Sequence, residues 1–161
     1  MRNRIVMVLM LAAAAVAVGG CNQATDANKV RDDVAKAQAA GQKKVADAQA
    51  NYDKAMAGAK KDVADAQIDA REKAAPTSDR AANNVADAHA DASKDVADAR
   101  YDVDKAKADA AYDVAVAQCE AQSGDANRSC KDTAKSNRDA ALASAKSARD
   151  EAHKNAQASN R

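Results

Sequence analysis

The sequence predicts an all-α protein made of long alanine-rich helices, which form an extended rod, a helical hairpin or a coiled coil. Hydrophobic residues make up 47% of the chain, but only 2% are aromatic and none is Phe or Trp. So few large apolar side chains cannot build a globular core. Alanine, however, has the highest helix propensity. We therefore expect extended helices without a globular core.

The spacing of the apolar residues also indicates helix. The motif Val-Ala-Asp-Ala begins at Val45, Val63, Val85 and Val96. When the series is extended to the other apolar positions in line with it, successive positions lie 11 or 7 residues apart. These steps correspond to three and two helical turns, so we expect nearly straight helices with a slight right-handed supercoil. Small Val and Ala side chains favour a close helix–helix seam, within or between chains. A lone amphipathic helix is the alternative. The predicted seam residues are Val34, Val45, Met56, Val63, Val85, Val96, Val103 and Val114.

Residues 1–20 have the pattern of a leader peptide. Arg2 and Arg4 precede an uncharged apolar run from Ile5 to Val18. This run has the length of a signal-peptide core and is shorter than the ~20 residues that a spanning helix needs. We therefore predict a signal peptide over 1–20.

The end of this leader carries a recognisable motif. Val18-Gly19-Gly20-Cys21 resembles the bacterial lipobox, which consists of an aliphatic residue, two small residues and Cys. In that family the thiol is diacylated, the leader is removed, and the new amino terminus is acylated, commonly with palmitate. The resemblance implies that Cys21 anchors the chain to a membrane. Asn22, in place of the Asp that retains enterobacterial lipoproteins in the inner membrane, implies the periplasmic face of the outer membrane. An uncleaved anchor is the alternative.

The chain after Cys21 begins with a tether and a first long helix. We assign the tether to 21–28, where Thr25 or Asp26 can cap the helix. Pro76 disfavours helix at the residue before it, and Ser78 or Asp79 can cap a new start. Because the apolar register continues across Pro76, a kinked helix and a hairpin both remain open. The predicted segments are a first helix over 29–75 and a break over 76–79.

Two further helices are predicted after this break. The second spans 80–122 and the third 126–158, with a turn at 123–125. In that turn, Gly124 suits the position after a helix and Asp125 suits the N-cap. The third helix has Leu142 as its only large apolar residue, so we expect it to be the weakest.

Two cysteines flank the predicted turn symmetrically. On one continuous helix, Cys119 and Cys130 would lie ~16 Å apart, whereas a disulfide needs Cα atoms within ~7 Å. A turn at the midpoint brings them together, so we predict a Cys119–Cys130 disulfide that stabilises the chain by roughly 3 kcal/mol. Interchain bonds in a parallel oligomer are the alternative. No histidine is near in sequence, and we expect His89 and His153 to be solvated rather than metal ligands. The segment from Cys119 to Lys135 resembles uncharacterised Ala/Lys/Asp-rich proteobacterial envelope proteins.

The sequence contains no pattern typical of enzymes. It has no phosphate-binding loop, no calcium loop and no catalytic set with a core to assemble it. The 25 Lys and Arg residues balance 24 Asp and Glu, so there is no basic excess for nucleic acid. We expect no catalytic residue, cofactor or metal.

These features predict a lipid-anchored structural or scaffolding protein of the bacterial envelope. In alanine-rich helix and lipid anchoring it is similar to the small murein lipoproteins, which join peptidoglycan through a C-terminal Lys. This chain is longer, and its last Lys is Lys154. We therefore expect non-covalent peptidoglycan contact, together with a homo-oligomer or a partner helix. The alternative is a stress-protective module, because the 11-residue repeats resemble those of late-embryogenesis-abundant proteins.

Overall fold

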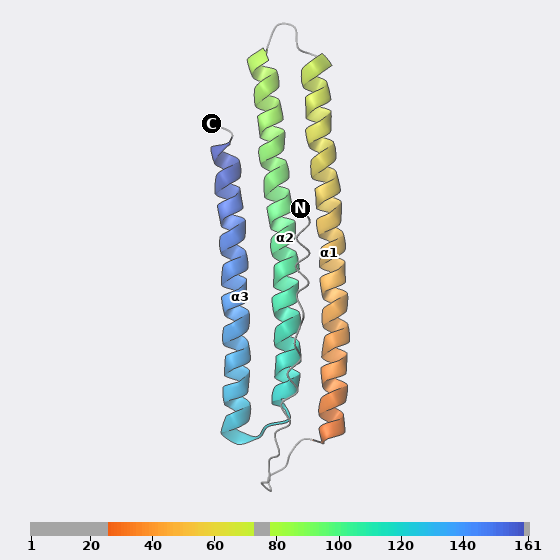
Figure 1. The fold of residues 1–161 in the computed structure, drawn as a ribbon, viewed down its shortest axis with the longest axis vertical. Coiled ribbons are helices and arrows are strands. Elements are labelled where there is room, and N and C mark those ends of the chain that lie inside the picture. The colour runs from red at the N-terminus through yellow and green to blue at the C-terminus, as the bar shows by residue number, and fades with distance from the viewer. Residues whose placement is uncertain (1–25, 73–77, 160–161) are drawn as a thin grey trace, which may run out of the picture.

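A computed structural model describes residues 26–72 and 78–159, and these residues are helical almost throughout. The described helices are α1 (Ala27–Glu72), α2 (Ser78–Cys119) and α3 (Gly124–Ala158). They confirm the all-α prediction, and each boundary lies within a few residues of the predicted one. In Figure 1 the helices run nearly straight and side by side, with α2 between the other two.

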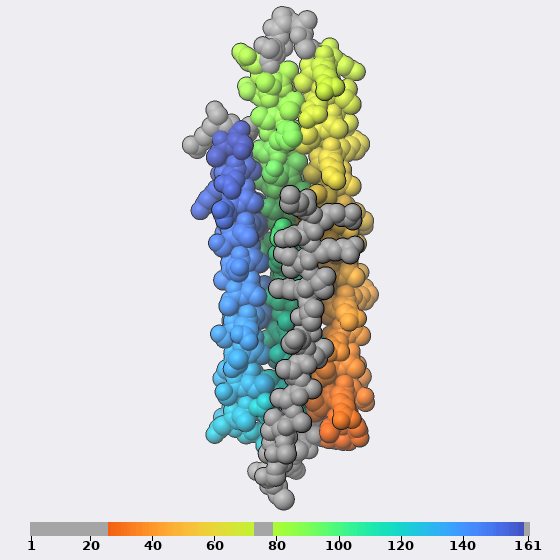
Figure 2. Space-filling view, viewed as in Figure 1, coloured from red at the N-terminus to blue at the C-terminus, as the bar shows by residue number. Residues whose placement is uncertain are grey.

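The three helices form one open layer rather than a closed bundle. α2 contacts both α1 and α3, whereas α1 and α3 make no contact with each other in the described part of the chain. The space-filling view shows the resulting elongated shape (Figure 2). Since α1 and α2 lie antiparallel (Figure 1), the chain forms a hairpin between them and not a kinked continuous helix. Pro76 itself lies outside the described residues.

α1 begins at a polar cap and presents one stripe to α2. The backbone N–H of Asn28 donates to Oδ1 of Asp26 at 2.9 Å, so Asp26 is the capping residue. Side chains that are buried or half-buried recur along the helix in steps of three and four residues. On its exposed surface, lysines bond to aspartates four residues later, as Lys43 does to Asp47 at 2.7 Å. Such pairs add a few tenths of a kcal/mol each.

The stripe on α1 includes a glycine at which two backbones meet. Gly41 is buried, and a Cβ atom placed on it would lie 2.7 Å from Cβ of Ala110 on α2 and 3.3 Å from its Cα. Carbon atoms in ordinary contact are about 3.5–4.0 Å apart. Only glycine therefore allows this approach. A Cβ atom placed on Gly58 would have no other atom within 4 Å, so no close helix contact requires a glycine there.

The buried residues are small and are shared among the three helices. α3 contributes alanines spaced 11 residues apart, three helical turns, so they form one line along its face. Leu142, the large apolar residue that the sequence places in α3, is half-buried. The buried apolar residues are Val30, Ala90, Val103, Ala108, Cys119, Ala134, Ala145 and Ala156.

Candidate functional site: the α2–α3 seam

The predicted seam residues all lie in α1 or α2 and are all at least partly covered. Val103 is buried at 4% exposure, and the other seven are half-buried. Because α1 contacts no described helix except α2, its half-buried side chains mark the α1–α2 interface. The predicted lipidation site, Cys21, lies outside the described residues.

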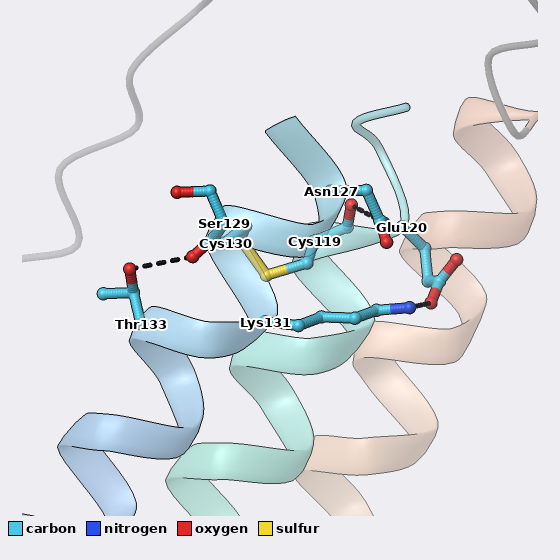
Figure 3. Close-up of a disulfide and its surroundings, with 7 residues drawn as sticks. All are labelled: Cys119, Glu120, Asn127, Ser129, Cys130, Lys131 and Thr133. Carbon is cyan, nitrogen blue, oxygen red and sulfur yellow. Dashed lines mark hydrogen bonds and ion pairs between the residues drawn. A yellow bond between two sulfur atoms is a disulfide. The ribbon is translucent and has the colours of Figure 1, made fainter. Parts of the chain in front are cut away.

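The turn between α2 and α3 carries the disulfide. Cys119 and Cys130 are bonded with their Cα atoms 5.7 Å apart, which is the pairing that the sequence favoured. Figure 3 shows that this bond joins the end of α2 to the first turns of α3. The side chain of Asn127 donates to the carbonyl oxygen of Cys119 at 2.7 Å, and Lys131 pairs with Glu120 at 2.6 Å. The turn is thus held by a covalent bond, a hydrogen bond and an ion pair.

The start of α3 differs in detail from the prediction. Ser123 occupies the N-cap position, and Asp125 lies in the first turn of the helix, where it pairs with Arg128. Gly124 has a φ of +57°, a conformation that glycine adopts without the steric penalty of a Cβ atom. We expected Gly124 to follow the last residue of α2 directly, but it is the first residue of α3. The reason is that α2 ends earlier than predicted, at Cys119.

Two similar side-chain clusters join α3 to α2 beyond the turn. In the Arg138 cluster, Nε of Arg138 donates to Oδ1 of Asp109 at 2.6 Å, and its guanidinium lies 5.5 Å from the ring centre of Tyr112. Lys105 also donates to Asp109, at 2.9 Å. Cations over tyrosine rings at such distances add a further attraction.

The Arg149 cluster repeats this arrangement 11 residues further along α3 and 11 residues back along α2. Its guanidinium lies 4.9 Å from the ring centre of Tyr101, and its Nε is 3.8 Å from Oδ1 of Asp98. A second nitrogen of Arg149 donates to Asp150 at 2.7 Å. The 11-residue repeat therefore places equivalent contacts at equivalent heights on two antiparallel helices.

These contacts shift the ionisation of the acidic residues. Partial burial would raise the pKa of Asp109, but hydrogen bonds from Lys105 and Arg138 outweigh it and lower the pKa below the ordinary 3.8. The hydrogen bond to Asp109 in turn raises the pKa of Arg138. Hydrogen bonds from Lys146 and Arg149 lower the pKa of Asp150 to about 2. The carboxylates thus stay ionised to lower pH in the folded chain.

We expect Asp109→Asn to lower the free energy of unfolding at pH 7 by about 1 kcal/mol, because it removes the charge from a partly buried pair. The lowered pKa means that Asp109 contributes fully above pH about 4 and loses its contribution on further acidification. The variant should therefore show a smaller loss of stability between pH 5 and pH 2. Urea unfolding across that range measures this. Asp102→Asn, on the exposed side of α2, is the control; an equal effect there would contradict the assignment.

An open groove lies along the layer and is lined from all three helices. Its volume is about 850 Å³, and its walls are mainly alanines of α2 and α3, with Tyr52 of α1 and Tyr101 of α2. Arg100, Asp104 and Lys107 lie along it, and Asp104 pairs with both cations. The described part of the chain holds no group of His, Cys, Asp and Glu residues that could bind a metal ion. The groove is thus a surface of small apolar side chains with a charged border.

The two histidines differ in their surroundings. His89 is exposed, as expected. His153 is not fully solvated, which corrects the prediction. Its side chain is 32% exposed, and its Nε2 lies 3.0 Å from Oδ1 of Asp98. Sequence reasoning missed this contact and both arginine clusters. The available signal was the 11-residue repetition of Arg-Asp in α3 and of Asp-x-x-Tyr in α2.

Comparisons with protein-family models, curated proteins and solved structures find no match for this chain. Among the helices that the structure describes, none combines the length and apolar character required to cross a membrane.

Proposed function

We propose that this protein is a lipid-anchored structural or scaffolding rod of the bacterial cell envelope. The observation that carries the proposal is the place of Cys21, at the end of a lipobox-like motif and a few residues before α1 begins at Ala27. A lipid on Cys21 would hold the start of the rod at a membrane surface. Asn22 supports the outer membrane, with the rod in the periplasm.

The geometry of the layer supports this role. α1 contains 46 residues, which corresponds to a length of about 70 Å. The beginning of α1 and the disulfide-bonded turn lie at the same end of the layer, and the end of α1 and the beginning of α2 lie at the other end (Figure 1). An anchor at Cys21 would therefore place the disulfide near the membrane and the end of α1, at Glu72, far from it. A rigid spacer needs this kind of separation between its ends.

Specific contacts between the helices support a rod rather than a stress-protective module. Proteins of the second class are disordered in dilute solution and gain helix when dried or bound. Here the close approach of α1 and α2 requires Gly41 to lie opposite Ala110, because a side chain at position 41 would overlap it. The Arg138 and Arg149 clusters likewise fix one register between α2 and α3. Contacts that depend on register stabilise one arrangement of the helices, which favours a folded rod.

Replacing Cys21 by serine tests the anchor. We expect the unaltered chain, expressed in a Gram-negative host, to incorporate labelled palmitate and to sediment with outer membranes on a density gradient. Cys21→Ser should abolish the label and the processing of the leader, because serine lacks the thiol that is acylated. Intact mass before and after reduction measures the lipid and the disulfide together.

A chain with Cys119→Ala and Cys130→Ala is the matched control, since it changes the other cysteines and keeps Cys21. It should retain the label and the membrane fraction. Absence of label from the unaltered chain, or its persistence in Cys21→Ser, would overturn the proposal.

A further inference from the structure

α2 has two faces that neither neighbouring helix covers, because it lies between α1 and α3 and these two make no contact in the described residues. The front face lines the groove of about 850 Å³ and carries Arg100 and Lys107. Both cations pair with one carboxylate, that of Asp104, and their side chains are 73% and 57% exposed. Two cations that share one carboxylate leave the front face with an excess of positive charge.

The opposite face of α2, its back face, is acidic. Asp95 and Asp102 each precede one of the two groove cations by five residues. Successive residues of an α-helix are rotated by about 100°, so a step of five residues turns a side chain by about 140° to the other side. Both aspartates are exposed, and Asp98 lies between them on the same side and is also exposed. Arg149 of α3 lies beside Asp98, which still leaves the back face with an excess of negative charge.

The charges on the two faces have the same spacing along the helix. Arg100 and Lys107 are seven residues apart, and so are Asp95 and Asp102. Seven residues are close to two turns, or about 10 Å. Two aspartates on the back of one copy can therefore meet both groove cations of another copy at the same time.

The groove is also large enough for a contact between two copies. Its lining extends along α2 from Ser93 to Ala111, which corresponds to about 27 Å of helix. With helices about 10 Å apart, three of them make a surface roughly 20 Å wide, so a covering layer would bury about 500 Å² on each copy. A total of about 1,000 Å² is the size at which specific interfaces begin. Small exposed side chains in the lining allow close approach: Ala111, Ala141, Ser144 and Ala148.

We propose that copies of this protein stack front to back, so that the groove of one copy receives the acidic back face of α2 of a second copy. Opposite charges select this arrangement, because front-to-front and back-to-back contacts would bring like charges together. The contact uses two different surfaces of the chain, so each stacked pair keeps one free front face and one free back face for further copies. The stacking requires no lipid on Cys21 and holds or fails independently of the anchor.

Analytical ultracentrifugation of the full chain in a mild non-ionic detergent tests the stacking. We expect the average mass in solution to rise with protein concentration beyond that of one chain. Raising the salt from about 0.1 M to about 1 M shortens the screening length from about 10 Å to about 3 Å. Association should therefore become several-fold weaker at the higher salt concentration.

Two double variants neutralise one face each. The front variant carries Arg100→Gln and Lys107→Gln, and the back variant carries Asp95→Asn and Asp102→Asn. Each should associate roughly tenfold more weakly than the unaltered chain, because each loses two ion pairs between copies. An equal mixture of the two variants should recover the original affinity, since the intact back of the first fits the intact groove of the second. The mixture should stop at two chains, because the remaining faces are neutral, and its recovery shows that both variants are folded.

The matched control removes two lysines that do not line the groove, with Lys43→Gln and Lys61→Gln on the exposed surface of α1. It should associate as strongly as the unaltered chain. A single chain at every concentration, loss of association in only one of the two double variants, a mixture no stronger than its components, or an equal loss in the control would each overturn the proposal.

Discussion

Replacing Cys119 and Cys130 together by alanine is expected to lower the free energy of unfolding by about 3 kcal/mol. A disulfide that spans 11 positions restricts the unfolded chain by about this amount. Alanine is the better replacement because Cys119 is 1% exposed, and a serine hydroxyl there would be buried. Denaturant unfolding followed by circular dichroism measures the change.

The unaltered chain in reductant provides an internal control. Reduction should lower its stability to nearly that of the double alanine variant, whereas the variant itself should not respond to reductant. We also expect α3 to become more sensitive to trypsin in both cases, because its buried side chains are small alanines and bury little apolar area each. Equal stability with and without the bond would contradict this view of α3.

Gly41→Ala and Gly58→Ala are expected to change stability differently, although the substitution is the same. Gly58 has open space around its Cα, so alanine there should stabilise the chain by about 1 kcal/mol through helix propensity. The same gain applies at Gly41, but the added methyl group would overlap Ala110. Overpacking of this kind costs roughly 1–3 kcal/mol. Gly41→Ala should therefore be less stable than Gly58→Ala by that difference, as measured by denaturant unfolding.

A second substitution shows whether the overlap with Ala110 is the cause. Ala110→Gly should be less harmful in the Gly41→Ala chain than in the unaltered chain, and the double-mutant cycle should give a coupling of at least about 0.5 kcal/mol. Additive effects, or an equal gain from alanine at both glycines, would show that α1 and α2 do not approach closely at this point.

Much of the secondary structure could be predicted from the sequence because its signals are local. Alanine content and the 11-residue repeat indicate long helices, and Asp26 caps α1 as one of the two residues expected to do so. The position of Gly124 and the spacing of the cysteines indicated the turn at which α2 and α3 meet. Each of these features depends on residues within a few turns of one another.

The arrangement of the helices could not be predicted in the same way. A stripe of valine and alanine identifies a face that packs, but it does not specify the partner, so the register across Pro76 left both a kinked helix and a hairpin open. α3 packs on α2 through Ala134, Ala145 and Ala156, and these contacts could not be predicted because alanine is too common in this chain to mark a buried position. The contacts of Arg138 and His153 depend on a register that only the folded structure provides.

The order of the helices in the layer has a mechanical consequence. In the described residues the chain passes along the layer three times, so the start of α1 and the end of α3 lie toward opposite ends (Figure 1). Tension between these points would act along both interfaces and load them in shear. Contacts loaded in shear resist together, whereas contacts that are peeled apart break one after another. A chain that passed along the layer twice would have both ends on the same side and would be peeled open.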